Sequence, residues 1–499
     1  MRSRTNNSHF KVKDMDIATG GTLVAILNEN DAQRLDLRSG DRVLVRCHHR
    51  SITCVLDISE SKKAVPKGRI GLFEEVLDKL HAKEGTLVKI QFTGKPESVK
   101  HIRAKLLGKR LSYKEMYHIS DDITNDRLTD IEKTYFISAS YIHGLNDEEV
   151  IGLTKAMVET GDRINFKGMT LDKHCIGGVP GNRTTMVVIP IVAAAGFKIP
   201  KTSSRAITSP AGTADTMECL AKVEMSENKI RRVVGKTKAC MVHGGSMNLA
   251  PADDKIIEVE HPLSIDAEGQ LLASVLAKKY SVSANHVLID IPMGKSTKAT
   301  TKRGARNLKK KFESVGRKLG MNVKVIITDG SHPIGNGIGP LLEAEDVMAV
   351  LRNDPLAPKD LRNKAIKMAG ILLSMTGKYS KSKGIKKAQK ILESGKAFKK
   401  MKDIIKAQGK QKKPKLGEFN LPVFSKKSGK IKEIDNEIIA KIARVAGAPK
   451  DKGSGIYISK KIHEKTKRNE LLYTVYAESN FKLELAAKFI KKDNGYSIN

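Results

Sequence analysis

Short β-branched runs dominate the first 95 residues of the chain. The clearest are GTLVAIL (21–27), DRVLVRC (41–47), SITCVLDI (51–58) and GTLVKIQF (85–92), each bounded by Gly, Asn or Asp turns. Runs of this kind between turn residues are typical of strands. The intervening stretch NENDAQRLDLRSGD contains an amphipathic helical turn. The pattern predicts a small β-rich domain over residues 1–95.

From about residue 102 to 163 the apolar positions change to helical spacing. Segments 104–123, 130–144 and 147–161 each place apolar residues at i, i+3 and i+4, which predicts three amphipathic helices. Asn146 and Asp147 are candidate caps for the third, with acidic residues in its first turn. We expect a helical domain over residues 96–165.

Beyond Phe166, apolar strand-like segments alternate with amphipathic ones. The apolar segments are 186–196, 286–293 and 323–330, and their alternation with helices predicts a sheet with parallel pairs covered by helices. The charged segment 409–419, GKQKKPKLGEF, reads as a linker. We therefore expect an α/β domain over 166–415 and a small α+β domain over 416–499.

Composition and charge narrow the function classes. No apolar run approaches the roughly 18 residues that span a bilayer, and the first residues lack the apolar region of a signal peptide, so we expect a cytoplasmic protein. The net charge of +35 suggests nucleic acid as a partner. However, lysines are densest in helical sequence between about residues 359 and 415, and aromatics are only 4%. Solvated helix faces, or attraction of anionic substrates, explain the charge better than specific nucleic-acid binding.

The five cysteines have no spacing typical of a metal site. Cys47 and Cys54 have His48 and His49 near them, but zinc ligands usually come at shorter spacings or in two clusters. We expect free thiols, and neither a metal nor a cofactor.

A glycine-rich turn between Asp172 and Thr185 has the sequence DKHCIGGVPGNRTT. Glycines let backbone N–H groups approach an anion, and the helix expected from Thr185 onward adds positive potential. Lys173 supplies a full charge. The turn therefore indicates a phosphate site, although such turns also have purely structural roles. It is not a Walker A loop, and the other candidate, at 294–296, has Ile289 in place of the first glycine.

Hydroxyl and small residues are concentrated between Lys201 and Glu218, in the sequence KTSSRAITSPAGTADTME. Short donors at this density suit the binding of oxyanions and ribose. A Ser/Thr-rich turn with a helix cap at Thr213 or Asp215 is the alternative.

These segments resemble the thymidine/pyrimidine nucleoside phosphorylase superfamily. Its signature is roughly Ser-Gly-Arg-Gly, a spacer, and Gly-Gly-Thr-x-Asp-x-x-Glu, and the chain has SSRA at 203–206 and AGTAD at 211–215 followed by Glu218. The family's KHSTGG element is matched by KHCIGG at 173–178. Further matches follow in order at 274–279, 328–335, 394–398 and 434–437. The resemblance covers about residues 100–499.

The resemblance implies an α/β fold in which an all-α domain lies beside a large α/β domain with a mixed, partly parallel sheet. The α domain would combine residues 96–165 with helices around 252–282, and the active site would lie in the cleft between the two domains. Residues 1–95 would add a swivelling, barrel-like domain. Members use inorganic phosphate to displace a base from C1′ of a nucleoside, and a homodimer or higher homo-oligomer is expected.

Departures from the family pattern bear on the substrate. Pyrimidine enzymes carry an Arg ahead of the Ser-x-x-x-Lys helix, and residues 258–274 contain none. The archaeal AMP phosphorylase branch is similar here and has an extra N-terminal β domain. That likeness implies phosphorolysis of AMP, and possible use of CMP and UMP, to a base and ribose 1,5-bisphosphate. The alternatives are a thymidine or pyrimidine nucleoside phosphorylase and a non-enzymatic nucleic-acid-binding protein.

The same likeness implies roles for particular residues. The nucleotide would be bound by Gly178, Ser204, Arg205, Ala206, Ile207, Thr208, Ser209, Thr213, Ser274 and Lys298. The attacking phosphate would be bound by Lys173, Ser203 and Thr213. Lys298 would hold the 5′-phosphate, with a surface lysine as the alternative.

Asp266 would protonate the departing base. A carboxylic acid can do so if enclosure and a nearby phosphate raise its pKa from about 3.9 toward neutrality. On the residues alone, a cap for the helix beginning near Ala267 is the favoured interpretation of Asp266.

Overall fold

Six strands at the N-terminal end close into a barrel in the order β1-β5-β2-β4-β3-β6. The structure is a computed structural model that describes residues 8–20, 23–206, 209–263, 265 and 267–499. The strands are β1 (Ser8–Asp14), β2 (Val24–Asn28), β3 (Arg42–Cys47), β4 (Arg50–Ser59), β5 (Arg69–Leu72) and β6 (Leu87–Thr93), with short helices α1 (Glu29–Leu35) and α2 (Glu74–Leu80). Apolar side chains from these strands fill the interior. The expected barrel-like domain is confirmed, and the four predicted strands are β2, β3, β4 and β6.

Helices follow the barrel, as the spacing predicts. They are α3 (Ser98–Leu106), α4 (Tyr113–Thr124), α5 (Asp130–His143) and α6 (Asp147–Glu159). One prediction is wrong: segment 104–123 is two helices rather than one, because Gly108 has a positive φ of 75° and Ser112 then caps α4. Asn146 caps α6, as expected, by accepting a hydrogen bond from the backbone N–H of Glu149 at 2.9 Å.

The chain forms two compact units, Met1–Leu145 with Lys255–Ala267, and Asn146–Asp254 with Glu268–Asn499. The barrel and α3 to α5 belong to the first unit. Helix α6 and helix α11 (Glu268–Tyr280) belong to the second, and α10 (Pro251–Leu263) runs from one to the other. The finer division at residues 95, 165 and 415 stays a prediction.

Parallel strands form the centre of the second unit. β10 (His286–Met293) pairs in parallel with both β7 (Leu171–Cys175) and β11 (Asn322–Asp329), and β8 (Ile199–Ser203) pairs in parallel with β9 (Ala239–His243). A parallel bridge between Thr170 and Lys198 links the two groups. The remaining elements of this part are α8 (Thr213–Glu218), α9 (Glu227–Thr237), a 3-10 turn (Gly245–Met247) and α12 (Lys302–Lys318).

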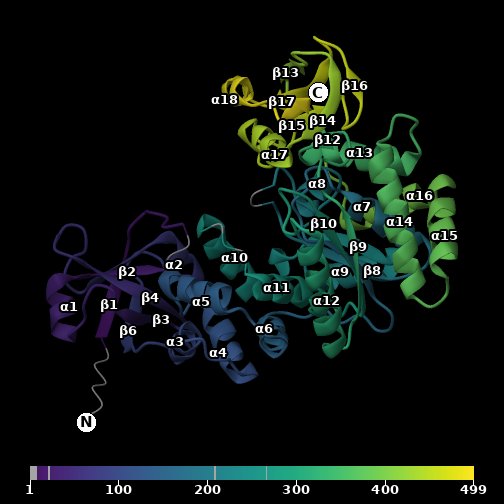
Figure 1. Cartoon of the computed structure of the whole chain (residues 1–499). Coiled ribbons are helices and arrows are strands. Elements are labelled where there is room, and N and C mark those ends of the chain that lie inside the picture. Colours follow the sequence, from purple (N-terminus) through teal and green to yellow (C-terminus); the bar gives the residue numbers. More distant parts are fainter. Residues whose placement is uncertain (1–7, 21–22, 207–208, 264, 266) are drawn as a thin grey trace. The chain divides into compact units, whose positions relative to one another are not determined.

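The apolar segment 186–196 is largely the helix α7 (Thr184–Ala194), so counting it with the strands is wrong, whereas the helix expected from Thr185 onward is confirmed. Its continuous apolar sequence reflects burial on all sides: residues 184–193 are all buried. Around it lie α14 (Lys359–Met375), α15 (Lys381–Glu393) and α16 (Lys396–Gln408), the lysine-rich helices at the right of Figure 1. Their apolar faces and α7 share one core.

The last eighty residues form a smaller group of strands and helices, drawn in yellow-green in Figure 1. The elements are β13 (Phe419–Phe424), β14 (Gly429–Ile434), α17 (Asn436–Val445), β15 (Gly455–Ile458), β16 (Lys465–Thr466), β17 (Leu471–Ala477), α18 (Asn480–Lys492) and β18 (Tyr496–Ile498). Strand β12 (Gly337–Ile338), just before α13 (Pro340–Arg352), pairs with β15. This shared sheet ties the C-terminal group to the α/β core, and an α+β character is confirmed.

Within the described residues, no helix is both long and apolar enough to cross a membrane.

Candidate functional site

A cavity of about 220 Å³ lies in the second unit, at the ends of β7 and β8. Both strands lead into the segments that the sequence singled out. Its wall includes four predicted residues, Ser203, Ser204, Ser209 and Thr213. The hydroxyl oxygen of Ser203 is buried and has no hydrogen-bond partner among the described residues. The cavity therefore offers a cluster of short donors, one of them unused.

Buried lysines form the charged floor of this cavity. The carboxylate of Asp172, fully buried on β7, accepts a hydrogen bond from Lys201 Nζ at 3.2 Å and lies 2.9 Å from Lys279 Nζ. Both lysines line the cavity. Burial lowers the pKa of Lys201 well below its ordinary value, and Asp172 only partly opposes this. Two lysines thus share one carboxylate here.

A second buried cluster also has two lysines around one carboxylate. Asp290 on β10 is 3.1 Å from Lys364 Nζ and 3.9 Å from Lys173 Nζ, and it accepts a hydrogen bond from Thr328 at 2.6 Å. Burial alone would raise the pKa of Asp290, but Lys173 and Lys364 with Thr328 hold it below its ordinary value. Burial lowers the pKa of Lys173, whose ammonium makes no hydrogen bond within the described residues.

When its two lysines are protonated, each cluster has a net charge of +1, because one carboxylate neutralises one of them. Both clusters are shielded from water. Uncompensated charge in a region of low dielectric attracts an anion strongly. His174, on the cavity wall, adds no charge, because burial and then Lys279 and Lys201 keep its pKa well below the ordinary value. The cavity is therefore suited to an oxyanion such as phosphate.

Glycines make room for the loop between these strands and α7. Gly177 and Gly178 have positive φ of 96° and 91°. A Cβ at Gly178 would lie 2.8 Å from the Cα of Thr297, so only glycine lets this loop pack against the segment that carries Lys298. Gly178, which the packing requires to be glycine, thus belongs to the turn that the sequence predicts to bind phosphate.

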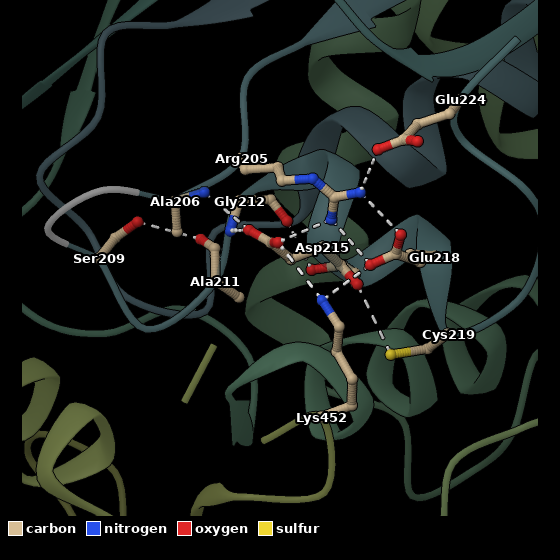
Figure 2. Close-up of polar contacts among 11 residues, drawn as sticks. Arg205, Ala206, Ser209, Ala211, Gly212, Asp215, Glu218, Cys219, Glu224 and Lys452 are labelled. Atoms are coloured by element: carbon tan, nitrogen blue, oxygen red, sulfur yellow. Dashed lines mark hydrogen bonds and ion pairs between the residues drawn. The ribbon is translucent and has the colours of Figure 1, made fainter. Parts of the chain in front are cut away.

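Asp215 holds both ends of the segment between Ala206 and Gly212 (Figure 2). Its carboxylate accepts hydrogen bonds from the backbone N–H of Ala206 at 2.7 Å and of Gly212 at 2.9 Å. Helix α8 begins at Thr213 with Gly212 as its N-cap, so the alternative of an N-cap at Thr213 or Asp215 is wrong. Asp215 therefore holds Ala206 and Gly212 to the first turn of the helix.

Arg205 is part of the same support rather than of the cavity wall. Its guanidinium donates two hydrogen bonds to Glu218, both at 2.8 Å, and one to Glu224 at 2.9 Å (Figure 2). Lys452, from the C-terminal group, lies 2.9 Å from Glu218 and 3.4 Å from Asp215. Hydrogen bonds from Arg205, then Lys452, lower the pKa of Glu218 to about 2. These side chains form a network of alternating charges beside Ala206 and Gly212.

Thr213 and Ser204 each contact a cation that the sequence reasoning did not assign. Arg183 donates a hydrogen bond to the Thr213 hydroxyl at 3.1 Å and forms an ion pair with Glu343. Burial raises the pKa of Glu343, although Arg183 opposes this. Lys278, which also lies 2.7 Å from Asp253, donates to the Ser204 hydroxyl at 3.4 Å.

A second cavity, of about 560 Å³, adjoins the first. The two share Gly177, Val179, Arg183 and Ser209 in their walls. The predicted residues Gly178 and Lys298 line the second, as do residues of α17. Some of the predicted site residues thus line one or the other of two neighbouring cavities in one compact unit.

Other predicted residues lie elsewhere. Lys173, Arg205, Ala206 and Ser274 are not among those lining either cavity, and Ile207, Thr208 and Asp266 lie outside the described residues. Their ligand roles stay predictions. Sequence reasoning missed the following charged residues: Asp172, Arg183, Lys201, Lys278, Lys279, Asp290 and Lys364. Most lie within or beside the recognised motifs, which is the signal that could have identified them.

Family models match three parts of the chain. Residues 99–161 match a model described as "Glycosyl transferase family, helical bundle domain", and residues 167–398 match "Glycosyl transferase family, a/b domain". Residues 430–497 match "Pyrimidine nucleoside phosphorylase C-terminal domain". These matches agree with the fold described above.

Relatives with two different names are similar to nearly the whole chain. A protein of Legionella pneumophila strain Paris named "Putative thymidine phosphorylase" is 45% identical over 451 residues, covering 90% of this chain and 87% of its own. AMP phosphorylase 1 of Archaeoglobus fulgidus is 44% identical over 472 residues, 93% of each chain. AMP phosphorylase of Methanococcus vannielii is 43% identical over 488 residues, 97% of this chain and 96% of its own.

Among solved structures, anthranilate phosphoribosyltransferase from Thermus thermophilus aligns with a TM-score of 0.51 and 17% identity. The alignment covers 62% of this chain and 98% of that one. At this identity the likeness concerns the fold alone.

Proposed function

We propose, since the chain belongs to the thymidine/pyrimidine nucleoside phosphorylase superfamily, that it is a nucleoside 5′-monophosphate phosphorylase with AMP as its main substrate. The products would be adenine and ribose 1,5-bisphosphate, and CMP and UMP are further candidate substrates. The observation that carries this proposal is the second cavity, lined by Lys298, which adjoins the one with the charged floor.

Two cavities match the two phosphates that such a reaction must bind. One phosphate attacks the ribose, and the other is already attached to its 5′ carbon. The first cavity has an unused hydroxyl at Ser203 and excess buried cations beneath it. The second has Lys298, in the segment that follows β10. A nucleoside lacks the 5′-phosphate that Lys298 would bind in this proposal.

In this proposal the attacking phosphate is held by Ser203 and Thr213. Lys173 contributes its charge from beneath, because its side chain is buried beside Asp290. A phosphate oxygen forms a bond to C1′ as the C1′–N bond breaks, and the electron pair of that bond goes to the base. Asp266 supplies the proton that the departing base needs. The likeness to AMP phosphorylases supports this role, as does the absence of Arg from residues 258–274.

A thymidine or pyrimidine nucleoside phosphorylase is the second candidate. The name of the Legionella relative and the description of the C-terminal family model favour it. The two candidates differ in whether a 5′-phosphate on the substrate promotes or prevents the reaction.

The deciding experiment incubates the protein with inorganic phosphate and, in turn, AMP, CMP, UMP, adenosine, uridine and thymidine. Released base and sugar phosphate are identified by chromatography and mass spectrometry. Faster reaction of AMP than of any nucleoside supports the proposal, and preference for uridine or thymidine overturns it. Light scattering on the same sample tests the expected homodimer or higher homo-oligomer.

Lys298→Ala tests the 5′-phosphate site directly. Loss of one charge-assisted contact costs about 1.5–3 kcal/mol, so KM for AMP should rise about tenfold or more, while residual activity on adenosine should hardly change. Lys295→Ala is the matched control, because Lys295 lies in the same loop but is 83% exposed, 3.8 Å from Glu433. An equal loss with AMP and adenosine in the Lys298 variant would contradict the assignment.

A further inference from the structure

The second cavity has a wall formed by the C-terminal group. Helix α17 contributes Asn436, Glu437, Ala440, Lys441 and Arg444 to its lining. Spacings of three and four residues place Glu437, Lys441 and Arg444 on one face of the helix. The opposite face, with Ile439, Ile442 and Ala443, is buried in the C-terminal core. The helix therefore presents a polar face to the cavity and an apolar face to its own domain.

Packing fixes this helix against the segment that carries Lys298. Asn436 is 3% exposed, and its side-chain amide donates a hydrogen bond to the backbone oxygen of Gly330 at 2.9 Å. A Cβ at Gly330 would lie 2.9 Å from Cγ2 of Thr297, next to Lys298. The N-terminal end of α17, the Gly330 turn and the Lys298 segment thus form one continuous contact.

Within the described residues, Asn436 and Arg444 on this wall have unused polar capacity, whereas Lys441 contacts an aromatic ring. The side-chain oxygen of Asn436 is buried and has no hydrogen-bond partner among the described residues. Arg444 is exposed, and within the same residues it forms no ion pair. The ammonium of Lys441 lies 4.5 Å from the centre of the Phe489 ring, with no carboxylate paired to it in the described part of the chain.

Charges on the cavity wall favour an anion. Among the described residues that line the cavity, Lys441 and Arg444 form no ion pair, and Glu437 is the one acidic side chain. Arg183, which also lines the cavity, is neutralised by Glu343. Cations grouped in this way bind a phosphate monoester better than a neutral sugar, because guanidinium and ammonium groups form charge-assisted hydrogen bonds with phosphate oxygens.

We propose that Lys441 and Arg444 of α17 complete the 5′-phosphate site, so that the C-terminal domain determines the preference for a nucleotide over a nucleoside. This inference rests on the proposed function, because it assigns the substrate's phosphate monoester to the second cavity. It adds two specificity-determining residues from a different part of the chain to Lys298.

The test uses the full-length protein with Lys441→Gln and Arg444→Gln combined. Binding of AMP and of adenosine is measured by calorimetry without inorganic phosphate, so no turnover is required. We expect the Kd for AMP to rise about tenfold or more, as for the loss of charge-assisted contacts, and the Kd for adenosine to stay within about twofold. Lys488→Gln, on α18 of the same domain, is the control for loss of one exposed positive charge outside the cavity.

A charge-preserving variant separates charge from shape. Lys441→Arg with Arg444→Lys should keep AMP affinity near the wild-type value, and its melting temperature shows that the helix is intact. Unchanged AMP binding in the Gln double variant, or an equal loss for AMP and adenosine, overturns the role of α17. If wild-type protein prefers nucleosides in the turnover assay, the proposed function fails, and AMP binding by the variants still decides the role of α17.

Discussion

The buried cluster around Asp172 permits a quantitative test of the charged floor. Asp172→Asn keeps the shape of the side chain but removes the anion that Lys201 and Lys279 share, at 3.2 and 2.9 Å. Neither lysine reaches water, since they are 4% and 1% exposed. Removing one partner of a buried ion pair costs about 3–5 kcal/mol. We expect the free energy of unfolding at neutral pH to fall by about that amount.

The cost of deprotonating one of these lysines gives a loss of similar magnitude in the free energy of unfolding. The folded variant can avoid a buried unpaired charge by deprotonating one lysine, whose ordinary pKa is 10.5. At pH 7 this costs about 5 kcal/mol, from about 1.4 kcal/mol for each pH unit below that value. The cost falls as pH rises, because the unfolded chain binds more protons than the folded variant, and stability then increases with pH. Because Asp172 opposes the lowering of the Lys201 pKa in the wild type, the variant should lose more stability than the wild type at pH 7, and this deficit should shrink as pH rises from 7 to 9.

Urea unfolding at pH 7, 8 and 9 measures both effects. Glu345→Gln is the matched control: its partner Lys413 lies at 2.7 Å, but both side chains are exposed, so a change within about 1 kcal/mol is expected. Asp172→Asn combined with Lys201→Met should recover part of the loss by removing one excess cation. A deficit below about 1 kcal/mol at pH 7, or one that does not change with pH, would refute this account of the cluster.

Three further predictions concern the catalytic and supporting residues. Asp266→Asn should reduce turnover about 10²- to 10⁴-fold with nucleotide binding retained; undiminished turnover in a steady-state assay would leave Asp266 as a helix cap. Glu218→Gln should destabilise the protein above pH 4.5, and the difference from wild type should disappear as pH falls from 4.5 toward about 2, because the folded pKa is lowered to about 2 from 4.5; a difference that persists in urea titrations at pH 2 would contradict this. Lys452→Met should raise KM for phosphate, whereas Lys452→Arg should keep it near the wild-type value, because Lys452 lies 2.9 Å from Glu218 beside the predicted phosphate-binding residues. A wild-type KM for phosphate in the Met variant would show that the contact is dispensable.

Local sequence was sufficient to predict the elements whose signals are local. The helix over 147–159 has its cap and its acidic first turn adjacent in sequence, and Asn146 caps it as expected. Ser203, Ser204, Ser209 and Thr213 belong to one short segment, and a single loop brings them to one cavity. The barrel strands that were missed, β1 and β5, are either rich in polar residues or only four residues long. Neither feature produces a clear alternating pattern.

Long-range pairing explains why the charged floor was missed. Asp172 precedes Lys201 by 29 residues and reaches Lys279 only because β7, β8 and α11 come together in the fold. Lysines are rarely fully buried unless they are paired, so sequence alone favours an exposed position for each. The alternation of side chains along a strand explains the placement of Lys173: Asp172 contacts Lys201 and Lys279, while Lys173, one residue on, contacts Asp290.

The buried clusters and the surface charge have different physical consequences. The +35 net charge comes largely from exposed side chains, whose fields salt screens within about 8–10 Å. The Asp172 and Asp290 clusters each hold two lysines to one carboxylate and are shielded from water, so salt screens them much less. A phosphate ion entering the first cavity would supply the missing negative charge. It would favour the protonated forms of Lys173 and Lys201, whose pKa values burial lowers. Affinity for the attacking phosphate should therefore depend on the buried lysines rather than on the overall charge of the chain.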